Sequence, residues 1–190
     1  MGKLRDIILG RTAPAQANLD NLFALPAAGI TLEISANLIS TNKASVCFKP
    51  ASGSAFANTT LDFKAILEME DDGQKPPVET IDSMGYKWVT IEADNLETLT
   101  TAIHAVNSTL ESNNFGPQLL CSVFAFTDRD SAQRVYLIYL YKRGTFYPFA
   151  PLRGERRDNE RELSLQAIIK DDIVLEADLE RWFPIWDLPL

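Results

Sequence analysis

The sequence predicts an α+β domain in which helices pack on a mainly antiparallel sheet. One observation is a pair of hairpin signals, a short one over residues 78–94 and a longer one over residues 118–143. The other is a strongly amphipathic helix over residues 94–110. Its apolar residues recur at three- and four-residue spacing and form one stripe: Leu96, Leu99, Ile103, Val106 and Leu110. Hairpins beside a helix with one apolar face are typical of a sheet covered by helices.

Length and composition predict one domain with a substantial core. The chain has 190 residues, of which 46% are apolar and 23% charged. A compact chain of this size buries roughly 70% of the surface that its unfolded form exposes. We therefore expect residues 1–190 to form a single α+β domain, with an N-terminal arm over residues 1–13 and a C-terminal helix and aromatic tail over residues 175–190.

The charge of the chain argues against two classes of partner. The formal net charge is −8, whereas phosphate backbones and anionic membranes both select basic surfaces. No apolar run reaches the roughly 20 residues that a membrane-spanning helix needs. We expect a cytoplasmic protein that does not bind nucleic acid, has no transmembrane segment and contacts the inner face of the membrane peripherally if at all.

The first quarter of the chain is predicted to hold an arm, a helix and a strand. In the arm, Leu4, Ile7 and Ile8 share one side, which favours packing onto the domain itself, with a membrane-surface anchor as the alternative. Residues 14–26 have apolar side chains at helical spacing, and Pro26 is expected to end that helix. Residues 29–39 alternate apolar and polar side chains, which predicts a half-buried strand. The alternating apolar residues are Ile30, Leu32 and Ile34.

The next segments lead to the first hairpin. A short strand is expected over residues 44–50 and ends at a proline. Small and polar residues over 51–60 predict a loop, and the apolar spacing of 61–70 predicts a short helix. The sequence "DDGQKPP" at 71–77 is typical of a solvated linker.

The two hairpins and the amphipathic helix between them carry clear turn and cap signals. Residues 83–85 are expected to be the first turn, and residues 128–132 the second. Asp94 followed by Glu97 indicates a capping box at the helix start. A left-handed stop after the helix is predicted from Asn113, Asn114 and Gly116.

The strand Val135–Tyr141 is apolar on both faces and should be central or lie at a dimer contact. The strand is followed by Gly144, Pro148 and Pro151. These residues are expected to end the ladder of the sheet and to carry the chain out to a binding surface. Further on, the apolar residues between 163 and 169 fit either a strand or a helix. Near the end of the chain, apolar residues between 179 and 183 recur at helical spacing.

Residue types that carry common enzyme chemistry are sparse. His104 is the one histidine, and it lies beside the apolar stripe of the long helix, where a structural role is the usual one. There is no Cys-x-x-Cys pattern and no paired histidine, so we expect no metal site and no cofactor. Cys47 and Cys121 lie in apolar runs and are predicted to be buried free thiols, with a disulfide as the open alternative. We expect the protein not to be an enzyme.

Basic and aromatic residues gather over residues 142–157 and form the main candidate site. Its members are Lys142, Arg143, Phe146, Tyr147, Phe149, Arg153, Arg156 and Arg157. Arginine and aromatic residues are favoured at recognition surfaces, and an arginine fork can hold a carboxylate or phosphate. The alternative is that the rings are core and that the arginines pair with nearby acidic residues. On the binding hypothesis, changing Arg156 and Arg157 together to Ala should weaken partner binding and leave folding nearly intact.

The C-terminal sequence "RWFPIWDLPL" is the second candidate. Trp182 and Trp186 stand here within five residues of each other. Large apolar side chains in such a run are expected either to pack back onto the domain or to form a subunit or partner interface.

Seven stretches of the chain resemble the PspAB family. They are "LGRT" (9–12), "NLDNLFALP" (18–26), "VCFKP" (46–50), "HAVNSTLESNNFGPQLLCSVFAF" (104–126), "YLYKRGTFYPFAP" (139–151), "GERRDNERELSL" (154–165) and "RWFP" (181–184). No matching stretch lies between about residues 51 and 85. The resemblance implies association with PspA, the phage-shock effector of membrane stress, and it supplies no catalytic residues.

The order of the predicted elements also resembles YbjN and type III secretion chaperone-like domains. That likeness implies a domain that dimerises and binds proteins through its sheet or flanking helices, although a fold does not fix a function. The sequence thus predicts an adaptor in a PspA-type envelope-stress response. The alternative is a small-ligand or anion sensor that uses the arginine-rich loop 142–157.

Overall fold

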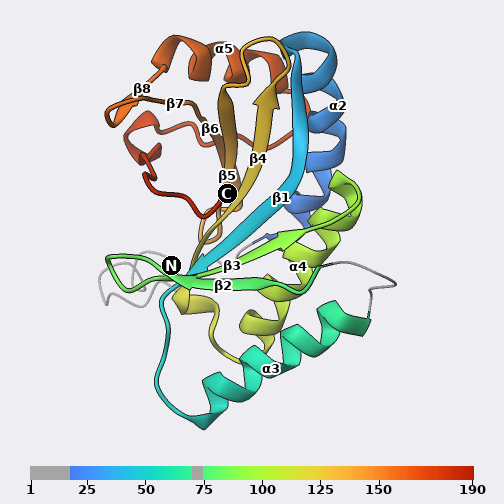
Figure 1. Ribbon diagram of the computed structural model, residues 1–190, viewed down its shortest axis with the longest axis vertical. Coiled ribbons are helices and arrows are strands. Elements are labelled where there is room, and N and C mark those ends of the chain that lie inside the picture. Colours follow the sequence, from blue (N-terminus) through green and yellow to red (C-terminus); the bar gives the residue numbers. More distant parts are fainter. Residues whose placement is uncertain (1–17, 70–74) are drawn as a thin grey trace, which may run out of the picture.

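A computed structural model describes residues 18–69 and 75–190, and it confirms the α+β class (Figure 1). Six antiparallel strands form one sheet in the order β2-β3-β1-β4-β5-β6. The strands are β1 (Leu38–Phe48), β2 (Val78–Ile81), β3 (Lys87–Glu92), β4 (Leu119–Asp128), β5 (Arg134–Leu140) and β6 (Thr145–Phe149), and a separate pair is formed by β7 (Pro151–Leu152) and β8 (Arg156–Arg157). The helices are η1 (Leu19–Ala24), α2 (Leu25–Ala36), α3 (Ser54–Met69), α4 (Leu96–Ser112), η2 (Gly116–Gln118), α5 (Asn159–Ile169) and η3 (Leu179–Arg181).

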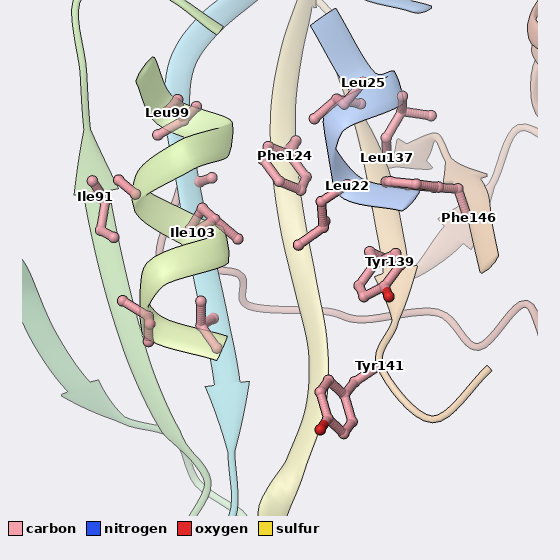
Figure 2. Close-up of a cluster of buried hydrophobic side chains, with 14 of the residues drawn as sticks. Leu22, Leu25, Ile91, Leu99, Ile103, Phe124, Leu137, Tyr139, Tyr141 and Phe146 are labelled. Carbon is pink, nitrogen blue, oxygen red and sulfur yellow. The ribbon is translucent and has the colours of Figure 1, made fainter. Parts of the chain in front are cut away.

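The two faces of the sheet are covered differently. Side chains alternate across a strand, so in β1 Val46 and Phe48 point to the helices while Cys47 points to the opposite face. The helix side holds the larger apolar cluster, in which Leu99 and Ile103 of α4 lie beside the sheet (Figure 2). The other face is covered by the chain that follows α5.

Both predicted hairpins and the long helix are confirmed. β2 pairs with β3 and β4 pairs with β5, each in antiparallel register. Four of the five residues of the α4 stripe are fully buried, and Leu96 is partly buried. Asn114 takes the left-handed conformation expected after the helix, with φ of 66°. The cap differs from the prediction, because the side chain of Asn95, not Asp94, accepts a hydrogen bond from the Thr98 amide at 2.9 Å.

The prediction for residues 26–36 is wrong. Pro26 stands in the first turn of α2 instead of ending a helix. This position suits proline, since the first amides of a helix have no intrahelical partner. The predicted strand over residues 29–39 is mostly helix, in which Leu25, Ala28 and Leu32 are buried at helical spacing. The strand starts only at Leu38, after Asn37 has ended the helix in a left-handed conformation.

The expected end of the sheet after β5 is also wrong. The chain turns at Gly144, where φ is 66°, and returns as β6 paired along β5, with Pro148 opposite Leu137. The amide of Phe146 points away from β5 and donates to the Val174 carbonyl at 2.8 Å. Alternate residues of a strand direct their amides the same way, so Pro148 lacks an N–H only on the outer side, where proline is tolerated.

Three smaller predictions have mixed outcomes, and two others fall wholly or mostly outside the described residues. The helix predicted over 61–70 exists but starts at Ser54, inside the segment expected to be a loop. The ambiguous segment 163–169 is helical, as part of α5. The predicted C-terminal helix over 175–190 is wrong, because this segment contains only the short η3 turn and Pro184 follows it closely. The predicted arm over residues 1–13 lies outside the described residues, as does most of the predicted linker.

Candidate functional site

The three rings of the arginine–aromatic segment are part of the core. Phe146, Tyr147 and Phe149 on β6 are each at most 1% exposed. The Tyr147 hydroxyl donates to the Phe183 carbonyl at 2.8 Å, and burial raises the pKa of this phenol. The rings therefore stabilise the sheet and the segment lying over it, and they are not presented to solvent.

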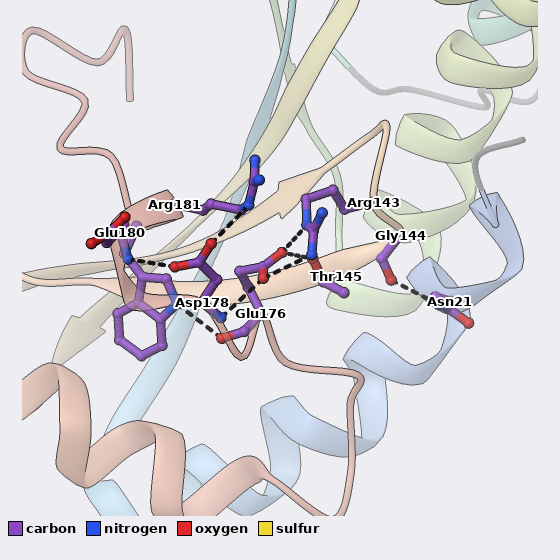
Figure 3. Close-up of polar contacts among 9 residues, drawn as sticks. Asn21, Arg143, Gly144, Thr145, Glu176, Asp178, Glu180 and Arg181 are labelled. Atoms are coloured by element: carbon purple, nitrogen blue, oxygen red, sulfur yellow. Dashed lines mark hydrogen bonds and ion pairs between the residues drawn. The ribbon is translucent and has the colours of Figure 1, made fainter. Parts of the chain in front are cut away.

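Arg143 ties the β5–β6 turn to the segment after α5 (Figure 3). Its guanidinium donates to both carboxylate oxygens of Glu176. The same carboxylate accepts from the Thr145 hydroxyl at 2.9 Å and from the Asp178 amide at 3.1 Å. Burial acts to raise the pKa of Glu176, but the hydrogen bonds outweigh it and hold that pKa below its ordinary value. Glu176 is thus a buried carboxylate that stays ionised because it is fully partnered.

Arg157 makes a second buried connection. Its guanidinium pairs with the buried carboxylate of Glu162 at 2.7 Å and donates to the Trp182 carbonyl. It also lies 5.5 Å from the centre of the Phe149 ring. Arg157 therefore joins β8, α5 and the C-terminal segment, as a structural residue would.

The other basic residues of the segment remain at the surface. Lys142, Arg153 and Arg156 are exposed, and the Arg156 side chain donates to the Arg153 carbonyl at 3.3 Å. Their role in binding stays a prediction. The cluster seen in the sequence thus divides into two arginines that clamp buried carboxylates, Arg143 and Arg157, and three other cations at the surface.

Three hollows of the described surface lie away from these arginines. One, of about 760 Å³, lies between η1 and the chain from Gln166 to Ala177. A second, of about 480 Å³, lies between the end of α2 and the start of α5. A third, of about 240 Å³, is bordered by β2, β3 and Pro189. None of the three is lined by Arg143, Arg153, Arg156 or Arg157.

The two tryptophans pack back onto the domain. Trp182 is 4% exposed, its ring stacks on Tyr147 with centroids 5.9 Å apart, and its indole donates to the Glu176 carbonyl at 3.0 Å. Trp186 is partly buried and meets Phe149 edge-on, with centroids 5.2 Å apart. They cover the sheet face that lacks helices.

An apolar stripe on the outer face of η1 and α2 is a feature that the sequence reasoning missed. We call Phe23, Ala27, Ile30 and Ile34 the α2 stripe. All four are exposed, Ile30 at 62% and Ile34 at 79% of their full surface. The spacing of four, three and four residues places them along one side of a helix. The apolar residues of the stripe are visible in the sequence, but their alternation with polar residues predicts a strand instead of a helix.

Neither His104 nor the two cysteines form a familiar catalytic arrangement with their described neighbours. The imidazole packs against Phe23, and its Nε2 lies 3.9 Å from Asp20. The Ser108 hydroxyl donates to the backbone carbonyl of His104 at 2.6 Å, not to its ring. Cys47 and Cys121 are buried free thiols, as predicted. They face each other across β1 and β4, and their hydrogen bond, together with burial, raises the pKa of Cys47.

No group of three His, Cys, Asp or Glu residues within the described part of the chain is placed to hold a metal ion. No helix within it has the length and apolar character to cross a membrane.

These features define a class of protein: an antiparallel α+β domain in which the rings of the arginine–aromatic cluster lie in the core and an exposed apolar stripe runs along η1 and α2. The particular family follows from the sequence. The model of the family PspAB, described as PspA associated protein B, matches residues 1–190, and the chain belongs to this family. Comparison with curated proteins and with solved structures returned no match.

Proposed function

We propose that the protein is a non-enzymatic adaptor of a PspA-type envelope-stress response, and that it binds a helix of a PspA-type partner through the α2 stripe. The observation that carries the proposal is the exposure of Phe23, Ile30 and Ile34 along one helix face. The family description supplies the partner, because it associates the family with PspA.

The stripe is rigidly supported from below. Leu25, Ala28 and Leu32, on the opposite side of the same helix, are at most 1% exposed. Burial of an exposed isoleucine side chain by a partner contributes roughly 1.5–3 kcal/mol of favourable free energy to binding. Because the backbone is already ordered, little of that gain is lost to ordering the site. A preformed apolar ridge of this kind suits binding.

The spacing of the stripe favours a helical occupant. Apolar residues separated by four, three and four positions form the seam with which one helix packs against another. An ion pair between Glu33 of α2 and Arg129 of the β4–β5 turn flanks the seam. Charged residues at the edge of an apolar seam help to set the register and orientation of a partner helix.

The rival function, a small-ligand or anion sensor, receives less support. A sensor of this kind needs a concave pocket ringed by arginines of the 142–157 loop. Arg143 and Arg157 instead hold buried carboxylates. Homodimerisation and a cytoplasmic location remain parts of the adaptor proposal, and the likeness to YbjN and type III secretion chaperone-like domains supports it by analogy.

A binding measurement with purified proteins tests the proposal. The PspA-type protein of the same cell is titrated against the wild-type chain, the double variant Ile30→Glu/Ile34→Glu, and the control Leu61→Glu. Leu61 is also exposed, at 63%, but lies on α3. We expect the double variant to lose at least about 100-fold in affinity, because two charges enter an apolar contact, and the control to bind normally. Equal binding by all three proteins would refute the stripe as the contact.

A further inference from the structure

The C-terminal residues 184–190 cover an apolar face of the sheet while making few polar contacts with it. We call these residues the strap. The face beneath includes Trp88 of β3, Val123 of β4, Ile138 of β5 and Phe149 of β6, all at most 5% exposed. Ile185, Trp186, Leu188 and Leu190 of the strap pack against this cluster and remain partly exposed. The strap is thus the outer layer of a face that has no helix over it.

Polar attachment of the C-terminal chain ends just before the strap. The Trp182 indole, the Trp182 carbonyl and the Phe183 carbonyl all have hydrogen-bond partners in the domain. Within residues 18–69 and 75–190, no hydrogen bond or ion pair involves residues 184–190. Two of the seven strap residues are prolines, which have no amide to offer to a strand. Asp187 also has φ of 58°, a conformation that non-glycine residues rarely adopt.

This contrast divides the C-terminal chain into an anchor and a movable part. Segments with few hydrogen bonds and partial burial open at a lower free energy than the core does. Opening at the Phe183–Pro184 junction would leave the Trp182 anchor intact and uncover a continuous apolar surface. Exposed apolar surfaces of that kind mark sites where proteins bind.

We propose that the strap is displaceable, and that the sheet face beneath it docks an extended partner segment that carries a tryptophan between aliphatic residues. The strap identifies that chemistry, because it is itself such a segment seated on the face, with Trp186 meeting Phe149. The hollow of about 240 Å³ bordered by Pro189, Leu190, Lys43 and Lys75 continues the surface past the strap. A longer occupant can therefore extend further than the strap does. This site is separate from the α2 stripe, and either can fail alone.

Peptide binding tests the docking site. The probe is a synthetic peptide of residues 184–190 that carries a fluorescent label, added to the full chain and to a variant that ends at Phe183, with the anisotropy of the label as the readout. A tethered segment has an effective concentration of about 1 mM. A peptide that binds the shortened variant with a dissociation constant of about 0.1 mM or less should therefore bind the full chain at least about tenfold more weakly. A peptide with Trp186→Ala should not bind. A folded shortened variant that does not bind the peptide, or equal binding by both proteins, would overturn the proposal.

Thiol labelling tests displacement in the full chain and needs no truncation. Cys47 and Cys121 belong to the cluster that the strap packs against and are 3% and 7% exposed. Trp186→Ala should speed their alkylation about tenfold or more through a more populated open state, when labelling is carried out without urea and the domain stays folded. The control Phe183→Ala alters a neighbouring ring that is 59% exposed, and its labelling rate should match the wild type. Labelling that occurs only with global unfolding in every variant would contradict a displaceable strap.

Discussion

Removing the Arg157 side chain should strongly destabilise the fold, whereas removing its neighbour Arg156 should not. This replaces the expectation from the sequence that both arginines can be changed to Ala with folding nearly intact. Arg157→Ala would leave the carboxylate of Glu162 buried, at 2% exposure, without its cation. It would also leave the Trp182 carbonyl without its donor. Breaking a buried ion pair from one side costs about 3–5 kcal/mol. Arg156 is exposed, and a surface substitution of this kind changes stability by about 0.5 kcal/mol or less.

Urea unfolding followed by far-ultraviolet circular dichroism measures the difference. With a slope of about 2 kcal/mol per molar urea, Arg157→Ala should lower the unfolding midpoint by about 1.5–2.5 M, and Arg156→Ala by less than about 0.3 M. Adding Glu162→Gln to Arg157→Ala should restore part of the loss, because the uncompensated charge is then removed. A double-mutant cycle isolates that coupling. Equal midpoints for the two arginine variants, or a double variant as unstable as the sum of the singles, would refute the assignment of Arg157 as a buried clamp.

Two further substitutions test separate parts of the fold. Glu176→Gln should destabilise the protein at pH 7, and the deficit should shrink as the pH falls below about 4.5, the ordinary pKa of a glutamate. The pKa of Glu176 is lowered in the folded state, so its stabilisation is present above the unfolded pKa and is lost as the pH falls through the folded pKa. Unfolding curves between pH 7 and pH 3 measure this, and a deficit independent of pH would contradict the ionised, fully partnered carboxylate. Asn95→Ala should cost about 1 kcal/mol by loss of the α4 cap, and thermal unfolding would show an unchanged midpoint if Asp94 were the cap instead.

Three of the elements predicted well from the sequence, α4, β4 and β5, bury nearly all of their apolar residues. In α4, Leu99, Ile103, Val106 and Leu110 all face the core, so the helical period is undisturbed. The same holds for β4 and β5, which are covered on both faces and appear as continuous apolar runs. In these elements the apolar residues of the sequence are also the buried residues of the structure, so the sequence pattern predicts the element correctly.

The α2 region was mispredicted because it carries apolar residues that are not buried. Ile30 and Ile34 are exposed on either side of the buried Leu32, and together they imitate the alternation of a strand. A pattern argument assigns every apolar residue to a core, so it fails where apolar residues serve a surface. The misleading residues are the ones that now form the proposed docking stripe.

The arginine–aromatic segment could be located but its role could not be assigned. Pairing with nearby acidic residues was foreseen and holds for Arg157 and Glu162, which are five residues apart. Sequence spacing does not show that Glu176, from a distant segment, neutralises Arg143. Sequence spacing also does not show that the missing amide of Pro148 lies on the outer side of the edge strand β6. Because of this position, β6 can pair with β5, and its three rings are buried in the core. Both facts depend on contacts between segments far apart in the chain.

Site-specific crosslinking in the native cell tests the central claim most directly. A photoreactive amino acid replaces Ile30 in one strain and Leu61 in another, and membrane stress is applied before illumination. We predict a crosslink to the PspA-type protein from position 30 and none from position 61. A crosslink from position 30 to a second copy of this chain alone, or no crosslink from position 30 at all, would contradict the proposal that the α2 stripe binds the partner.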